Sequence, residues 1–206
     1  MVAEFAPIYR TAELRAVEIA AKDEPLMERA GRAAAEVART MAADRGGGIL
    51  VLAGPGNNGG DALVIARCLR EWFFDVTVVF RGDATKLPPD AAAAYTALRD
   101  ASGETARDIP AGWKGALIVD GLFGIGLTRP LSADYAAQVD RANALGAPIL
   151  ALDVPSGLDA DTGLATGPTI RAAATATFIA LKPGLLTADG IDYCGNVSVH
   201  TLGIDA

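Results

Sequence analysis

The chain has 206 residues, which suits one well-buried domain and is too short for two domains of ordinary size, so we predict a single domain over residues 1–206. Hydrophobic residues make up 51% and charged residues 21% of the sequence, a composition that excludes disordered, fibrous and disulfide-built proteins. The formal net charge of −7 argues against nucleic acid as the main partner, because binding a phosphate backbone requires a basic surface.

Cysteine and histidine content restricts the possible chemistry. Cys68 and Cys194 show neither metal-ligand spacing nor a disulfide framework, although a bridge between the two stays open. His200 is the only histidine, so we expect carboxylates, rather than a histidine triad or a histidine zinc site, to carry acid–base chemistry. The N-terminal residues lack the pattern of a secretory signal, and no apolar stretch approaches the length of a bilayer span. We therefore expect a cytoplasmic protein with no membrane partner.

Two helices are predicted first, over residues 11–21 and from residue 24 or 25 to residue 43. The second places Leu26, Ala30 and Val37 on one face at helical spacing, with charged residues mostly on the other.

Short apolar runs then alternate with helical patterns. Strands are predicted at residues 49–53, 76–80, 116–120, 149–153, 176–180 and 196–200. Helices are predicted between them at residues 62–73, 90–101 and 131–145. This alternation predicts an α/β fold of three layers, a Rossmann-like and mostly parallel sheet with helices on both faces. The two N-terminal helices, within residues 11–43, are expected to pack on the α/β core of residues 49–206.

Unusual polar residues and glycines follow three of the predicted strands, at residues 54–61, 120–130 and 153–159. Ligands of open parallel sheets bind outside the carboxyl ends of the strands. We therefore expect these three segments to meet in one crevice.

The first segment contains the pattern G-x-G-x-x-G from Gly54 to Gly59, between a strand and a helix. Glycines in this position let the backbone approach a phosphate at the start of a helix. Asn57, Asn58 and Asp61 depart from the fingerprint of ordinary dehydrogenases. A purely structural tight turn with a helix cap at Asp61 is the weaker interpretation.

The second segment carries Gly121, Gly124 and Gly126, which permit close backbone approach, and Thr128 and Arg129, which are candidate phosphate donors. The alternative for Arg129 is a solvated surface charge.

Asp120 and Asp153 each end an apolar strand, where burying an unpaired carboxylate is costly. A helix cap or a salt bridge to arginine is the structural alternative. Ser156 lies in Asp-Val-Pro-Ser-Gly, without a nearby histidine or a nucleophile elbow, so we do not expect it to be a nucleophile. Its hydroxyl, an asparagine oxygen and a carboxylate suit a hard monovalent or divalent cation.

Taken together, these motifs resemble the NAD(P)H-hydrate epimerase family over essentially the whole chain. The matching segments are residues 27–31, 54–61, 119–127, 152–159 and 177–184. The resemblance implies an isomerase that interconverts the R and S epimers of hydrated NADH and NADPH (NADHX and NADPHX), which are damaged cofactors. It also implies a partner, an ADP/ATP-dependent dehydratase that acts on the S form and is fused to the epimerase in some proteins, and a homodimer.

The family pattern also implies the site residues. The substrate would be bound by Asn57, Asn58, Gly59, Gly60, Asp61, Gly124, Ile125, Gly126, Leu127, Thr128, Arg129, Pro130 and Asp153. A potassium ion (K⁺) would be held by Asn58, Asp120 and Ser156. Ile125 stands where many members have threonine or another small residue.

Asp153 is our candidate catalytic acid–base, because the hydrate is a hemiaminal whose hydroxyl must be protonated as it leaves. Loss of hydroxide to an iminium-like ring and ring opening both remain possible. Lys182 is expected either to reach the crevice or to be a surface lysine. Two alternative functions remain: an NAD(P)-dependent oxidoreductase, which would use Arg81 or Asp83 after the second strand, and a non-catalytic nucleotide-binding module.

Overall fold

The centre of the protein is one parallel sheet. A computed structural model describes residues 6–101 and 103–204 and contains a six-stranded sheet in the order β2-β1-β3-β4-β5-β6. All neighbouring strands are parallel, so the predicted α/β fold is confirmed. The strands are β1 (Gly48–Ala53), β2 (Val76–Phe80), β3 (Gly115–Gly121), β4 (Ile149–Leu152), β5 (Ala174–Phe178) and β6 (Asn196–His200).

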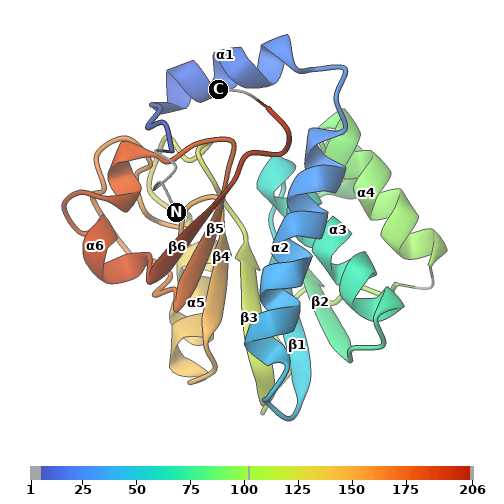
Figure 1. Ribbon diagram of the computed structural model, residues 1–206. Helices are drawn as coiled ribbons and strands as arrows, with labels where there is room; N and C mark the ends of the chain where they lie inside the picture. The colour runs from blue at the N-terminus through green and yellow to red at the C-terminus, as the bar shows by residue number, and fades with distance from the viewer. Residues whose placement is uncertain (1–5, 102, 205–206) are drawn as a thin grey trace.

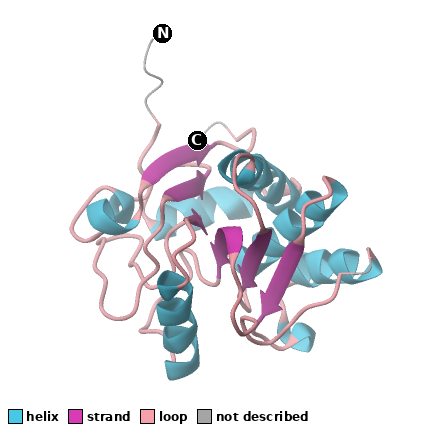
Figure 2. Ribbon diagram, turned by 90° about the horizontal axis from the view of Figure 1, so that it is seen from below, coloured by secondary structure: helices cyan, strands magenta, loops and turns pink. Residues whose placement is uncertain are grey.

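Helices cover both faces of the sheet (Figures 1 and 2). The helices are α1 (Thr11–Ala20), α2 (Leu26–Ala42), α3 (Asn57–Glu71), α4 (Pro89–Asp100), α5 (Ala133–Ala144) and α6 (Gly190–Tyr193), with short 3₁₀ turns at Ala84–Lys86 and Pro183–Leu185. One hydrophobic core joins α2 and α3 to one face, where it includes Ile49 and Val51 of β1. The other joins α5 to the opposite face, where it includes Leu50 and Leu52. Burial on both faces explains why β1 is a continuous apolar run rather than an alternating one.

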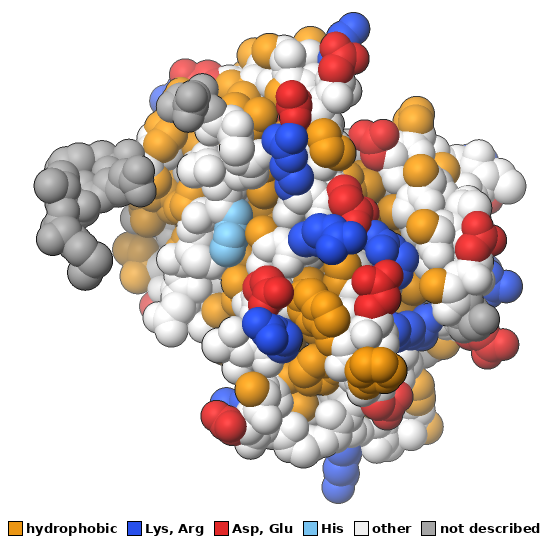
Figure 3. Space-filling model, turned by 45° about the vertical axis from the view of Figure 1, so that its right-hand side comes forward, with side chains coloured by type: hydrophobic (Ala, Val, Ile, Leu, Met, Phe, Trp, Pro, Cys, Tyr) orange, Lys and Arg blue, Asp and Glu red, His pale blue; other side chains and the backbone are white. Residues whose placement is uncertain are grey.

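Close packing of α2 on α3 depends on a glycine. A Cβ atom on Gly31 would lie 2.4 Å from the side chain of Val64, so any larger residue would push the two helices apart. Ion pairs link neighbouring side chains of these helices, among them Arg67 with Glu28 and Glu71. Figure 3 shows positively and negatively charged side chains interspersed on one face of the molecule. Among the helices of the described residues, none has the length and apolar character needed to cross a membrane.

The start of α3 differs from the sequence prediction. The helix begins at Asn57 rather than Ala62, with Gly56 as its N-cap, so the predicted loop residues 57–61 form its first turns. Low helix propensity led to the wrong boundary, because tertiary contacts override propensity at Gly59 and Gly60. A Cβ on Gly59 would lie 2.0 Å from the carbonyl oxygen of Gly54, and one on Gly60 would lie 2.6 Å from the side chain of Met27.

The ends of β4 and β5 also differ from the prediction, and for a shared reason. The strands end at Leu152 and Phe178, and the next residues, Asp153 and Ile179, both have a φ of 65°. In each case the amide two residues after the strand end donates to the carbonyl of the last strand residue, at 2.7 Å. These tight three-residue turns redirect the chain within one residue, which an apolar pattern cannot reveal. Helix α6 was not predicted either.

Helix α1 lies across the carboxyl ends of the strands rather than against a face of the sheet (Figure 1). Leu14 anchors it and is 1% exposed. The chain before it pairs with the segment after β5: the Tyr9 amide donates to the Leu181 carbonyl at 2.8 Å, and the Leu181 amide donates to the Pro7 carbonyl at 2.9 Å. The helix therefore roofs the edge of the sheet at which parallel α/β proteins bind ligands.

Candidate active site

A cavity of about 590 Å³ lies between the carboxyl ends of the strands and the roof formed by α1. The floor of the cavity lies between the neighbouring strands β1 and β3. The chain leaves these two strands toward opposite faces of the sheet, because α3, which follows β1, packs on one face and α5, which follows β3, packs on the other. Open α/β sheets bind ligands at such a switch point. The cavity is lined by Leu14, Arg15, Glu18, Ile19, Pro55, Gly56, Asn57, Asn58, Asp61, Pro88, Leu122, Phe123, Gly124, Ile125, Gly126, Asp153, Phe178 and Lys182.

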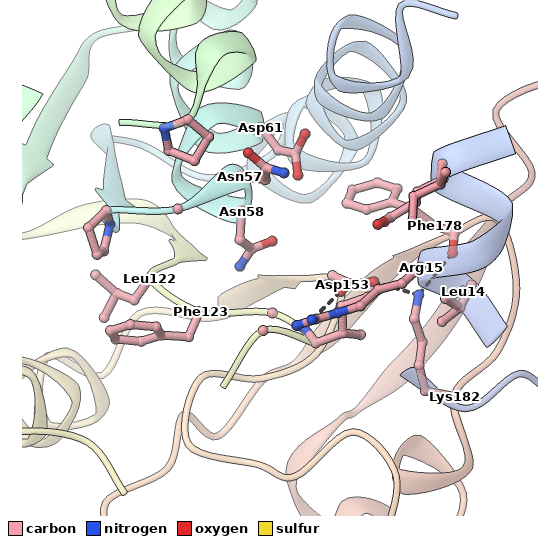
Figure 4. A pocket seen from close by; sticks show the side chains of 18 residues that line it. Leu14, Arg15, Asn57, Asn58, Asp61, Leu122, Phe123, Asp153, Phe178 and Lys182 are labelled. Carbon is pink, nitrogen blue, oxygen red and sulfur yellow. Dashed lines mark hydrogen bonds and ion pairs between the residues drawn. The ribbon is translucent and has the colours of Figure 1, made fainter. Parts of the chain in front are cut away.

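The three predicted segments do meet at this cavity. Asn57, Asn58 and Asp61 come from α3, residues 124–126 from the loop after β3, and Asp153 from the turn after β4 (Figure 4). The loops after β1 and β3 are in direct contact, because the Gly54 amide donates to the Gly121 carbonyl at 3.0 Å. A Cβ on Gly54 would lie 1.8 Å from the carbonyl oxygen of Leu122, so this position accepts only glycine without moving one of the loops.

Asp120 and Ser156 form a buried network that holds the amides of Leu122 and Phe123, two residues that line the cavity. Asp120 and Ser156 are both 0% exposed. Asp120 Oδ1 accepts from the Ser156 hydroxyl at 2.7 Å, and Oδ2 accepts from the Ser156 amide at 2.8 Å. Burial raises the pKa of Asp120 to about 6, while these bonds from Ser156 and one from the Leu122 amide act in the opposite direction. The Ser156 hydroxyl oxygen also accepts from the Phe123 amide at 2.9 Å.

Asn58 has a buried side-chain amide whose oxygen and nitrogen have no hydrogen-bond partner among the described residues. Leaving a buried amide without a hydrogen-bond partner is costly, so a ligand that binds to it would stabilise the site. It lies beside the loop after β3: a Cβ on Gly124 would lie 3.3 Å from Asn58 Oδ1 and 2.8 Å from Asp153 Oδ2. An unpartnered amide oxygen, a carboxylate and a hydroxyl are hard oxygen donors that fit a potassium ion.

Asp153 forms an ion pair with a lysine that is almost completely buried. The Lys182 ammonium lies 2.5 Å from Asp153 Oδ1, and Lys182 is 1% exposed (Figure 4). The ammonium also donates to Thr177 Oγ1 and to the Phe178 carbonyl, each at 2.8 Å. Asp153 Oδ2 accepts from the Ile125 amide at 3.2 Å. The carboxylate is thus held between β5 and the loop after β3, with its charge compensated inside the cavity.

Residues 23–184 match the sequence model of a protein family described as the N-terminus of YjeF-related proteins. The chain belongs to this family.

The chain is similar to several relatives whose names refer to NAD(P)H hydrates. The chain is 48% identical over 203 residues to the NAD(P)H-hydrate epimerase of Achromobacter xylosoxidans, covering 96% of both chains. It is 43% identical over 204 residues to the NAD(P)H-hydrate epimerase of Bordetella bronchiseptica, covering 96% of this chain and 88% of that one. It is also 43% identical over 189 residues to a bifunctional NAD(P)H-hydrate repair enzyme of Leishmania major, covering 87% of this chain but 33% of that longer protein.

The crystal structure of yeast ynu0 shares the fold. It superposes with a TM-score of 0.75 at 22% sequence identity, and the match covers 94% of this chain and 87% of the yeast chain. At this level of identity the likeness supports the three-layer α/β fold alone.

Six residues assigned to the substrate through the family pattern lie outside this cavity. Gly59 and Gly60 are buried in the packing of α3. Leu127, Thr128, Arg129 and Pro130 line a second cavity of about 580 Å³, together with Asp159 and Thr162. Their contact with the substrate stays a prediction.

Arg81 and Asp83, which an oxidoreductase would use after β2, line a third cavity of about 550 Å³. Arg81 is paired there with Asp108, at 2.7 Å, and with Asp134, at 3.4 Å.

Sequence reasoning missed the contribution of α1 to the site. Leu14, Arg15, Glu18 and Ile19 line the cavity although they belong to an unremarkable amphipathic helix. No motif marked them, since their role follows from where the helix is docked. The sequence leaves two possibilities for Lys182, a position in the crevice or one on the surface. The structure places it inside the cavity. Its position directly after a predicted strand was the available signal.

Proposed function

We propose that the chain epimerises hydrated NADH and NADPH at carbon six of the nicotinamide ring, which keeps both epimers available for repair. The observation that carries this proposal is the buried Asp153–Lys182 pair in a cavity that also contains the start of α3. Family membership supports the same activity, because relatives at 43% and 48% identity are named NAD(P)H-hydrate epimerase.

The start of α3 is suited to the diphosphate of the cofactor. The backbone N–H groups of Asn57, Asn58 and Gly59 precede the first hydrogen bond of the helix, in which the Gly60 amide donates to the Gly56 carbonyl, and the helix field favours an anion at this end. Gly56 leaves the approach open, because a Cβ there would meet no atom within 4 Å. With the diphosphate at α3, the damaged ring would extend toward Asp153, Lys182 and Phe178 on the other side of the cavity.

Asp153 then supplies acid–base chemistry to the ring. The nitrogen lone pair of the hemiaminal expels the hydroxyl at carbon six, which must be protonated as it leaves, and water then adds to the opposite face. A carboxyl group within reach of the oxygen can exchange the required proton. Lys182 and the Ile125 amide orient Asp153, so that the carboxylate does not need to reorganise during the reaction.

Asn58, Asp120 and Ser156 would hold potassium beside this site. When bound, the ion would supply a fixed positive charge next to the unpartnered Asn58 oxygen. The Ser156 hydroxyl itself holds the loop after β3, because it accepts a hydrogen bond from the Phe123 amide.

The product would be consumed by a dehydratase specific for the S epimer. The bifunctional name of the Leishmania relative supports a fusion of the two activities in that protein.

The assay that tests this proposal supplies purified R-hydrated NADH, an excess of S-specific dehydratase and its nucleotide. We expect NADH to be recovered faster than in the same mixture without the chain. Asp153→Asn should lower kcat by roughly 10²-fold or more, because the amide cannot exchange the proton. The control is Asp100→Asn, an exposed carboxylate at the end of α4, which should keep the activity. Recovery at the spontaneous rate would contradict the proposal.

A further inference from the structure

We propose that Asp61 is a second catalytic carboxyl group, which exchanges a proton with the reacting oxygen on the face of the ring opposite to Asp153. This inference rests on the proposed function and deepens it, because it assigns one proton carrier to each side of the inverted carbon.

The position of Asp61 is unusual for a carboxyl group. It lies in the second turn of α3, is 9% exposed and lines the cavity. Its side chain forms no hydrogen bond or ion pair with any residue in the described parts of the chain. Burying a carboxyl group without a partner is expensive, and a purely structural role would have favoured an apolar residue or a paired one.

Asp61 and Asp153 reach the cavity from different walls. Asp61 projects from α3, while Asp153 projects from the turn after β4, and Figure 4 shows the two side chains above and below the open space. If the diphosphate of the cofactor lies at the start of α3, one carboxyl group would face each side of carbon six of the ring.

Asp153 and Asp61 have neighbours of opposite charge: a cation lies beside Asp153, whereas the charged groups near Asp61 are mainly carboxylates. Lys182 compensates the charge of Asp153 at 2.5 Å. The charged groups that act on the pKa of Asp61 include the carboxylates of Asp153, Glu18 of α1 and Asp90 of α4, and the cation Lys182. Burial, and then the repulsion from Asp153, Glu18 and Asp90, raises the pKa of Asp61 well above its usual range, against a smaller opposing effect of Lys182. Asp61 therefore holds its proton to a higher pH than an ordinary carboxyl group, whereas Asp153 is ion-paired with Lys182, a division that suits an acid and a base.

An acid at Asp61 and a base at Asp153 account for each proton that the reaction moves. Protonated Asp61 gives its proton to the departing hydroxyl, the bond from carbon six to oxygen breaks, and the ring nitrogen lone pair forms the iminium. A water molecule on the other face adds to carbon six and gives a proton to Asp153. One proton has then moved from Asp61 to Asp153 through substrate and water, with no net oxidation. The reverse direction uses the same two groups with their roles exchanged, so an epimerase needs both carboxyl groups and one proton shared between them.

The test compares Asp61→Asn with wild type and with Asp100→Asn, a control that removes an exposed carboxylate outside the cavity. Epimerisation of R-hydrated NADH is followed through excess dehydratase across a pH series. We expect Asp61→Asn to lower kcat by about 100-fold or more while KM stays within about threefold, because the amide keeps the shape but cannot exchange a proton. We expect Asp100→Asn to keep kcat within about twofold. Wild-type kcat should fall at high pH as the pair loses its shared proton.

The outcomes separate this inference from the proposed function. An active wild type together with an unchanged kcat in Asp61→Asn would overturn the role of Asp61 alone, as would a loss confined to KM. A wild type that does not accelerate epimerisation would overturn the proposed function and this inference together. If Asp61→Asn does not fold, as judged by circular dichroism, the wild-type profile decides: a kcat that does not fall at high pH contradicts the shared proton.

Discussion

Lys182 and Asp153 lie after the neighbouring strands β5 and β4 and meet 2.5 Å apart, with Lys182 almost completely buried. Asp153 lies in a tight turn at which its own φ is positive, and Lys182 follows a second such turn at Ile179. The pair therefore depends on backbone geometry at two neighbouring strand ends, which fixes the carboxylate before any ligand enters. Residues held in this sparsely populated conformation cluster at functional sites.

Replacing one member of this pair should be more harmful than replacing both. Lys182→Met leaves the Asp153 carboxylate uncompensated in a nearly buried position, so we expect the free energy of unfolding to fall by about 3 kcal/mol. The double variant Lys182→Met with Asp153→Asn should recover most of that stability without recovering activity. Urea unfolding and the epimerase assay measure the two effects. Lys86→Met is the control, because that side chain is 82% exposed and should change stability by less than about 0.5 kcal/mol.

A second prediction concerns the contact between the loops after β1 and β3. Gly54→Ala would place a methyl group 1.8 Å from the Leu122 carbonyl oxygen, so we expect a loss of about 3 kcal/mol in unfolding free energy and a large loss of activity. Gly56→Ala is the matched control, since a Cβ there meets no atom within 4 Å. It should cost no more than about 1 kcal/mol, the effect expected at a helix N-cap. Equal stability of the two variants would show that the loops can separate freely.

Potassium should stabilise the folded protein through Asn58, Asp120 and Ser156. At constant ionic strength, replacing choline chloride by potassium chloride should raise the unfolding temperature, and an ion at 100 times its Kd would contribute about 2.7 kcal/mol. Ser156→Ala and Asn58→Ala should abolish this response, because each removes an oxygen donor. Ser132→Ala should retain it, because that serine lies at the start of α5 and makes no capping hydrogen bond. A response that survives in Ser156→Ala would exclude the proposed site.

The raised pKa of Asp61 predicts how stability changes with pH. A carboxyl group whose pKa is higher in the folded state than its ordinary value of 3.8 binds more protons when folded. Its contribution to stability is therefore fully present below about pH 3.8 and is lost as the pH rises through the folded pKa. Asp61→Asn should thus show a weaker decline in unfolding free energy with rising pH than wild type. Urea unfolding at several pH values measures the difference, and parallel profiles would contradict the assignment.

The sheet could be predicted from sequence because its strands are buried on both faces. Continuous apolar runs such as Ile49–Ala53 leave few alternatives, and all six strands were located within two residues at each end. The convergence of Asn58, Gly124 and Asp153 followed from the same topology, since carboxyl ends of parallel strands share one edge.

The remaining features depend on tertiary contacts. Helix α3 starts five residues earlier than its propensities indicate because Gly59 packs against the Gly54 carbonyl. Lys182 can be buried because its ammonium forms an ion pair with Asp153 and donates to the Thr177 hydroxyl. Neither contact can be predicted from the residues that adjoin Lys182 in the sequence. The docking of α1 over the site is set by Leu14 and by pairing at residue 181, far along the chain.

The backbone pairing of Pro7 and Tyr9 with Leu181 joins the amino-terminal segment to the residue immediately before Lys182. A protease that cuts the exposed connection at residues 22–24 would free, in one event, the helix above the cavity and the segment that braces the buried ammonium. Resistance to such cleavage would rise when a cofactor fills the space beneath α1. Protease protection therefore offers a measure of occupancy that requires neither turnover nor a coupled enzyme.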